Sequence, residues 1–419
     1  MSAEASEPNR VTFSRRRLAQ SALAAPVVLS GSATACRLPT VEPPAVVEPP
    51  VNQYLPWIEV RADAIRNNAS VISAATGGRR VVPVVKTNGY GLGDVQVARA
   101  LDEVSVVWGT MVVRPSEALR LLDGGVRKPV LLMGARVDRP MAQALVLRGV
   151  RLSLTSLDEI AMLVPVARAL RRPVPIHLEI DTGYGRMGAL FSRAEEWARS
   201  LTGAKHLLLE GLSTYYVDDE AVTSVQVERF NAAIAKFKAA GLRPSIIHAP
   251  HSNPILGRPE TLKGCNATRP GLIVYGVYPS ARRQAVSQLN LQVAHRLMTR
   301  VLRVEKLEPG HGSIAGLPIK LDAPRYYATI GIGVHDGLRY YPASGKTKKV
   351  EIRGRLYDAT DGRNYNHMMI DLGEDATDVI AGDVVKIFSW ERPELHPNAD
   401  VDTAYWQAFY GPDIRRTVI

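Results

Sequence analysis

The sequence predicts an α/β protein in which a (β/α)8 barrel is followed by a mostly β C-terminal domain. The chain has 419 residues, more than the ~250–300 residues that one hydrophobic core can serve, so more than one domain is expected. From residue 81, short runs of β-branched residues alternate with amphipathic stretches. After residue 294, alternating strands separated by glycine and aspartate turns replace the helical patterns.

The barrel prediction depends on the number of strand candidates. Amphipathic stretches such as 95–101, 116–122, 156–170 and 225–240 fall between these candidates. Such alternation favours parallel strands, and eight strand–helix units in about 200 residues are typical of a closed barrel, with an open doubly wound sheet as the alternative. The strand candidates are 81–86, 106–112, 129–133, 150–154, 174–180, 207–212, 245–248 and 272–275.

The C-terminal domain is predicted over 294–419, after a barrel domain over 55–293. Its apolar residues alternate with polar ones, which is typical of strands with one buried face. Residues 57–60 precede the first barrel unit and are expected to return as a strand to this β domain. The strand candidates are 297–307, 327–332, 350–357, 368–372 and 384–388.

The N-terminus has the parts of a secretory signal, predicted over 1–35. The run SRRRL at 14–18 precedes an apolar, alanine-rich run, and residues 33–35 (ATA) match an A-x-A cleavage site. The paired arginines favour a twin-arginine signal and a periplasmic location, with a short amphipathic helix as the alternative. The proline-rich residues 36–54 predict an extended tether. Lipid anchoring at Cys36 is not favoured, because Ala33 is a poor residue for a lipid-attachment motif.

Composition excludes several classes of protein. Two cysteines are too few for a disulfide scaffold or a four-cysteine zinc site. The net charge of +11 is scattered along the chain, so no nucleic-acid partner is expected. We find no stretch long enough to span a bilayer and no metal-ligand pattern.

Candidate catalytic residues stand at strand ends, where barrels place their active sites. Lys86 closes the first strand candidate, and desolvation there lowers the pKa of a lysine and makes it a nucleophile for a carbonyl cofactor. A surface lysine at a loop edge is the alternative on position alone.

Three further strand ends carry polar side chains. Residues 181–188 (DTGYGRMG) place Arg186 over the barrel mouth, where it can bind a carboxylate or phenolate, or lie at the surface on a glycine turn. Ser252 and the amides around Gly271 can bind a phosphate. His248, taken alone, is more typical of a hydrogen-bonded core histidine.

These motifs together resemble the alanine racemase family of fold-type III pyridoxal phosphate enzymes. The family's cofactor motif VKANAYGHG is matched by residues 85–93 (VKTNGYGLG), and its opening W-I-E-(I/V) is matched by residues 57–60 (WIEV). Residues 64–68 (AIRNN), 181–188 and 269–276 (RPGLIVYG) also match. The resemblance starts around residue 55, is strong across the barrel and is weaker after residue 290.

The resemblance implies a role for each matching residue. Lys86 would hold pyridoxal 5'-phosphate as a Schiff base and act as base on one face of the substrate. Arg269 would face the pyridine nitrogen, supported by a hydrogen bond that it donates to His248, and a charged arginine there favours simple proton exchange. Arg186 would lie near the cofactor's phenolate oxygen and the substrate carboxylate. The implied phosphate contacts are Tyr90, Ser252, Gly271, Leu272 and Tyr405.

The chain departs from the family at the second catalytic base. The family's partner-subunit tyrosine, within VGYADG, is replaced by Val334 in residues 332–337 (IGVHDG). The adjacent His335 is the predicted second acid or base, although it needs a bulge or turn to point inward. The following aspartate and glycine favour such a turn, and Tyr215, Tyr340 and Tyr341 are alternatives.

The amino-acid pocket departs as well. A stacking histidine of the family is Tyr215 here, an asparagine is His251, and a lysine that is often carbamylated is Glu179, which keeps a negative group near Arg186. The family's Met-Asp substrate loop aligns with Tyr365-Asn366 or Asn366-His367, and we take Asn366 as the substrate contact.

The sequence therefore predicts an exported homodimer that interconverts L- and D-amino acids by proton exchange at Cα. Two rivals remain: a one-base aldolase or lyase on the same fold, and a catalytically idle cofactor-binding protein. They remain because the altered residues cluster at the second base while the cofactor residues are largely retained. The sequence does not identify the amino acid.

Overall fold

The structure is a computed structural model of the chain. It describes residues 52–311, 313–314, 317–318, 321–338, 348–359, 365–396, 410 and 414–419. The predicted signal, residues 36–51 of the predicted tether with Cys36, and the candidates Tyr340, Tyr341 and Tyr405 lie outside the described residues.

A ring of eight parallel strands forms the first sheet and confirms the (β/α)8 barrel. The strands pair in the order β2-β10-β9-β8-β6-β5-β4-β3, and bridges from Val81 to Val107 and from Val84 to Met111 join the two ends. The strands are β2 (Arg80–Val81), β3 (Thr110–Val112), β4 (Val130–Leu132), β5 (Arg151–Leu154), β6 (Val174–Asp181), β8 (Leu207–Ser213), β9 (Ile246–His248) and β10 (Ala267–Thr268), and β7 (Ala189–Leu190) pairs with β6.

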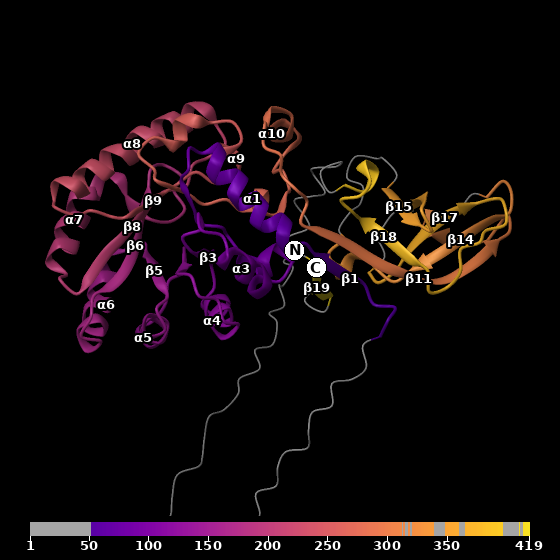
Figure 1. The fold of residues 1–419 in the computed structure, drawn as a ribbon, viewed down its shortest axis with the longest axis horizontal. Helices are drawn as coiled ribbons and strands as arrows, with labels where there is room; N and C mark the ends of the chain where they lie inside the picture. The colour runs from indigo at the N-terminus through magenta and orange to yellow at the C-terminus, as the bar shows by residue number, and fades with distance from the viewer. Residues whose placement is uncertain are drawn as a thin grey trace, which may run out of the picture. The chain divides into compact units, whose positions relative to one another are not determined.

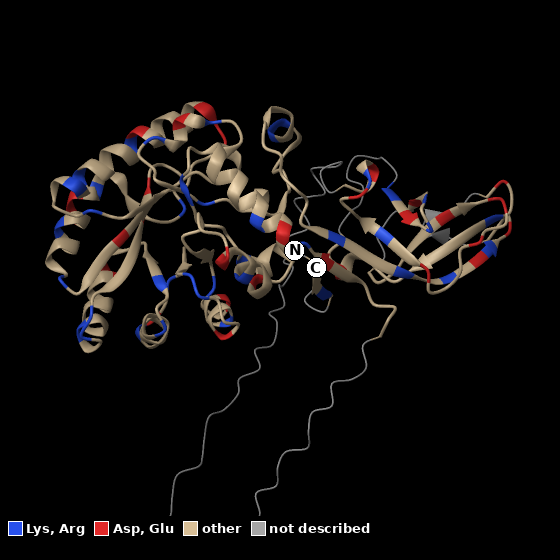
Figure 2. Ribbon diagram, viewed as in Figure 1, with Lys and Arg blue, Asp and Glu red and all other residues tan. Residues whose placement is uncertain are grey.

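Helices surround this ring (Figure 1). Their starts follow from the sequence, because Asp138 and Asp219 accept hydrogen bonds from the backbone N–H groups of Met141 and Val222, each at 3.0 Å, and so cap α5 and α8. Lysine and arginine are interspersed with aspartate and glutamate along the outer helices (Figure 2). The helices are α1 (Ala62–Ala75), α3 (Asp94–Asp102), α4 (Pro115–Asp123), α5 (Arg139–Leu147), α6 (Leu157–Ala169), α7 (Ala194–Gly203) and α8 (Glu220–Ala239), with the short α2 (Lys86–Tyr90), α9 (Ser252–Ile255) and α10 (Ala281–Val286).

The predicted eighth strand at 272–275 is wrong. Leu272–Tyr275 form the 3-10 helix η3, and the eighth strand is the shorter β10, which ends before Arg269. Pro270 has no backbone N–H to continue the sheet, and Gly271 turns the chain away from it. A short buried apolar run does not distinguish a strand from a helical turn by its periodicity.

A mostly antiparallel second sheet forms the C-terminal domain. Its order is β14-β17-β16-β15-β18-β11-β1-β19, with a further pairing of β14 to β11. Its strands are β1 (Trp57–Val60), β11 (His295–Leu307), β14 (Arg325–Ile330), β15 (Lys348–Ile352), β16 (Arg355–Ala359), β17 (Met368–Gly373), β18 (Val384–Phe388) and β19 (Arg415–Val418), and β12 (Ser313–Ile314) pairs with β13 (Leu317–Pro318).

Two details of this sheet bear on the sequence predictions. The return of residues 57–60 is confirmed, since β1 pairs antiparallel with β11. The single strand predicted at 350–357 is instead the hairpin β15–β16, because Arg353 and Gly354 adopt φ angles of 49° and 77°, which suit a two-residue hairpin turn.

None of the helices in the described part of the chain is long and apolar enough to cross a membrane.

Candidate active site

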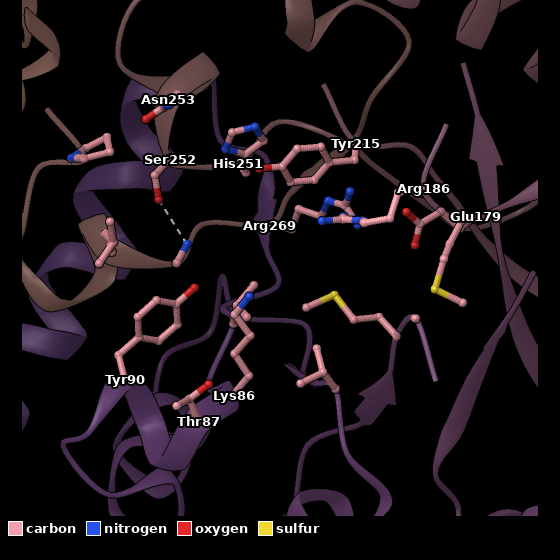
Figure 3. Close-up of a pocket in the computed structure, with 18 residues that line it drawn as sticks. Lys86, Thr87, Tyr90, Glu179, Arg186, Tyr215, His251, Ser252, Asn253 and Arg269 are labelled. Carbon is pink, nitrogen blue, oxygen red and sulfur yellow. Dashed lines mark hydrogen bonds between the residues drawn. The ribbon is translucent and has the colours of Figure 1, made fainter. Parts of the chain in front are cut away.

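A cavity of about 540 Å³ is lined by residues that follow the barrel strands (Figure 3). Ligand sites of small-molecule enzymes typically have this size. The structure brings together seven of the predicted site residues in its wall, namely Lys86, Tyr90, Arg186, Ser252, Arg269, Gly271 and Leu272.

Lys86 enters the cavity from the start of an unusual turn. Thr87, Asn88, Gly89 and Tyr90 all have φ angles between 54° and 63°, so the chain makes a left-handed turn immediately after the lysine. Such a turn costs about 1–2 kcal/mol per non-glycine residue, so other contacts must hold it. Burial, followed by the positive charges of neighbouring arginines, lowers the pKa of Lys86 and favours its neutral, nucleophilic amine.

Glu117 makes the main contact that holds this turn. Its role was not predicted from the sequence. Its buried carboxylate accepts a hydrogen bond from the backbone N–H of Thr87 at 2.7 Å. It also accepts from the N–H groups of Val113 and Arg114, at 3.1 and 3.0 Å, where it caps α4. The capping pattern, a glutamate in the first turn of a helix, is visible in the sequence, but the link to Thr87 is tertiary.

Arg269 is a buried cation at the centre of the cavity wall. Its Nη2 donates a hydrogen bond to the carbonyl oxygen of Thr214 at 2.6 Å. Burial lowers the pKa of Arg269, while the carboxylate of Glu179 opposes this effect. Arginine has so high an intrinsic pKa that the guanidinium stays charged near neutral pH.

Arg186 is held over the cavity by a glycine-rich loop. The carboxylate of Asp181 accepts hydrogen bonds from the N–H groups of Gly183, at 2.8 Å, and Gly185, at 3.1 and 3.2 Å, which fixes the start of the loop. The guanidinium carbon of Arg186 lies 4.7 Å from the ring centroid of Tyr184 and 4.9 Å from that of Tyr215. These contacts turn the arginine toward the cavity (Figure 3).

A cradle of hydroxyl and amide groups lies at the other end of the cavity, formed by Tyr90, Ser252 and Gly271. The N–H of Gly271 donates to the Ser252 hydroxyl oxygen at 3.1 Å. A Cβ atom at Gly271 would lie 2.4 Å from the Tyr90 hydroxyl, so only glycine leaves this space open. Hydroxyl and backbone N–H donors arranged in this way suit an anion such as a phosphate.

Comparisons with known proteins agree with this geometry. The family model described as "Alanine racemase, N-terminal domain" matches residues 60–279. The chain belongs to this family. It is 32% identical to an alanine racemase of Symbiobacterium thermophilum over 79% of this chain and 87% of that protein, and 31% identical to one of Desulforamulus reducens over 80% and 91%.

Solved structures of the alanine racemase family share the fold. The crystal structure of alanine racemase from a D-cycloserine-producing Streptomyces lavendulae superposes with a TM-score of 0.78 at 25% identity. The superposition covers 88% of this chain and 98% of that chain, so both the barrel and the C-terminal β domain take part.

His248 does not make the contact that the family resemblance implied. Its Nε2 lies 3.1 Å from Nδ1 of His177, while Arg269 donates to Thr214 instead. His248 is fully buried and is not among the residues that line the cavity. The hydrogen bond predicted to Arg269 is therefore wrong, and the core-histidine interpretation fits better. The contact partner His177 was not predicted from the sequence either. Its ring fits here because Gly211 has no side chain; a Cβ at Gly211 would lie 2.2 Å from the His177 ring.

The residues that depart from the family pattern form an aromatic cluster. The ring of Tyr215 stacks on His251 with centroids 4.7 Å apart and an interplanar angle of 6°. Burial lowers the pKa of His251 to about 4, and its Nε2 donates to the carbonyl oxygen of Tyr216 at 2.9 Å. Glu179 lines the same cavity as Tyr215 and His251.

His335 and Asn366 lie in the C-terminal domain, and neither is among the residues that line the cavity of this chain. The structure brings their segments together, because the N–H of His335 donates to the carbonyl oxygen of Tyr365 at 2.9 Å. The turn expected at Asp336-Gly337 is confirmed as the 3-10 helix η4 (Val334–Asp336), and His335 is exposed on it.

Proposed function

We propose that this member of the alanine racemase family is a pyridoxal phosphate-dependent enzyme that interconverts L- and D-amino acids. The observation that carries the proposal is the position of Lys86, which shares one cavity with a phosphate-sized cradle and two arginines. The names of the relatives and their coverage of both domains support the racemase activity.

The residues present fit pyridoxal phosphate. The space left open by Gly271 beside Tyr90 and Ser252 suits its phosphate, and Lys86 suits its aldehyde. Arg269 would face the ring nitrogen and Arg186 would bind the substrate carboxylate. When bound, the cofactor withdraws electrons and makes the Cα proton of an amino acid acidic. The lowered pKa of Lys86 favours the neutral form of its amine, and a neutral Nζ can accept that proton.

Purified protein tests the proposal directly. We expect a visible absorbance band that shifts when an amino acid is added, and we expect Lys86→Ala to lack it. A borohydride-reducible band that survives in Lys86→Ala would contradict the assignment of Lys86. In heavy water, a racemase exchanges the α-proton of both enantiomers and inverts them. A lyase would exchange one enantiomer only, and an idle cofactor-binding protein neither.

We also propose that the active unit is a homodimer in which each cavity faces the C-terminal domain of the partner subunit. Two observations support it: His335 and Asn366 do not line the cavity of their own chain, and Tyr184 and Met187 beside the cavity are 43% and 36% exposed. Light scattering should report a dimer. A monomer with full activity would refute this proposal.

Finally, we propose export through the twin-arginine route. The support is the sequence of residues 1–35, with its arginine run at 15–17, its alanine-rich apolar run and its cleavage pattern. Replacing Arg15 and Arg16 with lysine should trap the precursor in the cytoplasm. Normal periplasmic delivery of that variant would contradict the proposal.

A further inference from the structure

Racemisation needs a proton carrier on each side of the Cα atom, and Lys86 supplies only one. Val334 has no group that can move a proton. Among the cavity-lining residues that the structure describes, most of the other titratable groups have another task. Glu179 balances the charge of Arg269, and His251 is held neutral with its Nε2 proton on the Tyr216 carbonyl.

Tyr215 is a titratable side chain that lines the same cavity as Lys86. Figure 3 shows the two residues on opposite sides of the space that they enclose. The backbone of Tyr215 is fixed, because its carbonyl oxygen accepts a hydrogen bond from Nε2 of Gln226 at 3.0 Å. Its ring is fixed by the parallel stack on His251. A side chain held in this way loses little conformational entropy when it acts on a substrate.

Two guanidinium groups flank the Tyr215 ring. The guanidinium carbons of Arg186 and Arg269 lie 4.9 and 5.6 Å from its centroid. Neighbouring positive charge stabilises the negative charge that a phenol acquires when it loses its proton. The same phenol, once protonated, can return a proton to carbon, so the environment supports both directions of transfer.

We propose that Tyr215 is the acid–base group opposite Lys86 and that it acts on the cavity of its own chain; this inference depends on the racemase function proposed above. In one direction Nζ of Lys86 accepts the α-proton while the Tyr215 hydroxyl donates a proton to the other side of Cα. In the reverse direction the phenolate of Tyr215 accepts and the ammonium of Lys86 donates. One C–H bond breaks and one forms, and the two groups exchange protonation states, so no further reactant is needed.

The first test is Tyr215→Phe, which removes the hydroxyl and keeps the ring on His251. We expect α-proton exchange from one enantiomer to fall by about 10²–10⁴-fold, while exchange from the other stays near the wild-type rate. Tyr326→Phe, in β14 and not among the residues that line the cavity, is the control and should exchange both enantiomers normally. Equal loss from both enantiomers, or no loss, would overturn the proposal. Wild-type protein that exchanges only one enantiomer would refute the racemase itself.

Mixed dimers test whether Tyr215 acts on the cavity of its own chain. When Lys86→Ala and Tyr215→Phe subunits are mixed, each cavity keeps one defect, so no racemase activity should return. If Tyr215 acted on the partner's cavity, one intact site would form and activity would return. The rival that uses the partner's His335 is tested with His335→Asn: a one-sided loss of exchange in this variant, with normal exchange in Tyr215→Phe, would assign the role to His335 and overturn the proposal.

Cofactor-free protein gives a readout that does not depend on turnover. Tetranitromethane reacts with tyrosine as the phenolate, and mass spectrometry of peptides measures each tyrosine separately. We expect Tyr215 to be nitrated faster than Tyr184 although Tyr184 is the more exposed, because Tyr215 lies beside both arginines. Faster nitration of Tyr184 would contradict the proposed charge stabilisation.

Discussion

Replacing Glu117 with alanine should weaken cofactor binding, although Glu117 itself is not among the residues that line the cavity. Glu117 holds the left-handed turn after Lys86 through the N–H of Thr87, and it caps α4 through two further N–H groups. Without the carboxylate, fewer hydrogen bonds hold the turn at its strained φ angles, and the backbone of Lys86 is free to shift.

The expected magnitude follows from the hydrogen bonds that are lost. Three backbone donors lose their acceptor, and at the low end of about 1–3 kcal/mol each the protein loses about 3 kcal/mol of stability. For a folding unit the size of the barrel domain over 55–293, that corresponds to a fall in melting temperature of about 6 °C. If only the bond to Thr87 affects the bound state, a loss of about 1.4 kcal/mol raises the Kd for pyridoxal phosphate about tenfold.

Glu159→Ala is the matched control for this prediction. Glu159 is equally buried and caps α6 by accepting from the N–H groups of Thr155 and Ser156, at 2.7 and 2.9 Å. It has no hydrogen bond to the Lys86 turn among those of the described residues, so its loss should lower the melting temperature but leave the cofactor Kd unchanged. Thermal melts and equilibrium titrations of cofactor-free protein measure both quantities. An unchanged Kd in Glu117→Ala would refute the reasoning.

Gly271→Ala should raise the Kd for pyridoxal phosphate tenfold or more, because its Cβ would lie 2.4 Å from the Tyr90 hydroxyl. Gly203→Ala, where a Cβ meets open space, should leave the Kd unchanged, and equal titration curves for the two variants would speak against the cradle. The lowered pKa of Lys86 raises the fraction of its free amine at any pH below the usual lysine value. In cofactor-free protein, the rate of reductive methylation of Lys86, measured by mass spectrometry of peptides from about pH 7 upward, should therefore level off at a lower pH than the rate for a model lysine peptide. The same pH dependence for Lys86 and the model peptide would contradict the shift.

The sequence predicted the barrel well because each barrel strand is a local run of apolar residues. Residues 174–180 and 207–212, for example, were found nearly to their observed ends in β6 and β8. The run at 272–275 was wrongly predicted as a strand because it is also a local run of apolar residues, and its composition suits a buried strand. The turn at Gly271 is set by the neighbouring loops.

The cavity was predictable where a motif fixed both residue type and position. Lys86, Arg269 and Gly271 follow the ends of β2 and β10 within five residues along the chain, and the topology of a barrel brings such positions together. The roles of Glu117 and His177 were not predictable, because they depend on contacts with residues 30 and 71 positions away. Such tertiary contacts depend on how the elements of the barrel pack, and they produce no periodic pattern in the sequence.

The pairing of β1 with β19 fixes the order in which the protein can finish folding. Residues 57–60 are synthesised early, but both of their neighbours in the sheet, β11 and β19, come much later in the chain. Arg416 in β19 donates a hydrogen bond from Nε to the carbonyl oxygen of Gly91 at 2.7 Å, at the end of the left-handed turn that follows Lys86. A nascent chain can form all the barrel strands while this turn still lacks that contact, because residue 416 has not left the ribosome. The lysine turn therefore receives this support only after residue 416 has been synthesised, and a chain truncated before that residue never receives it.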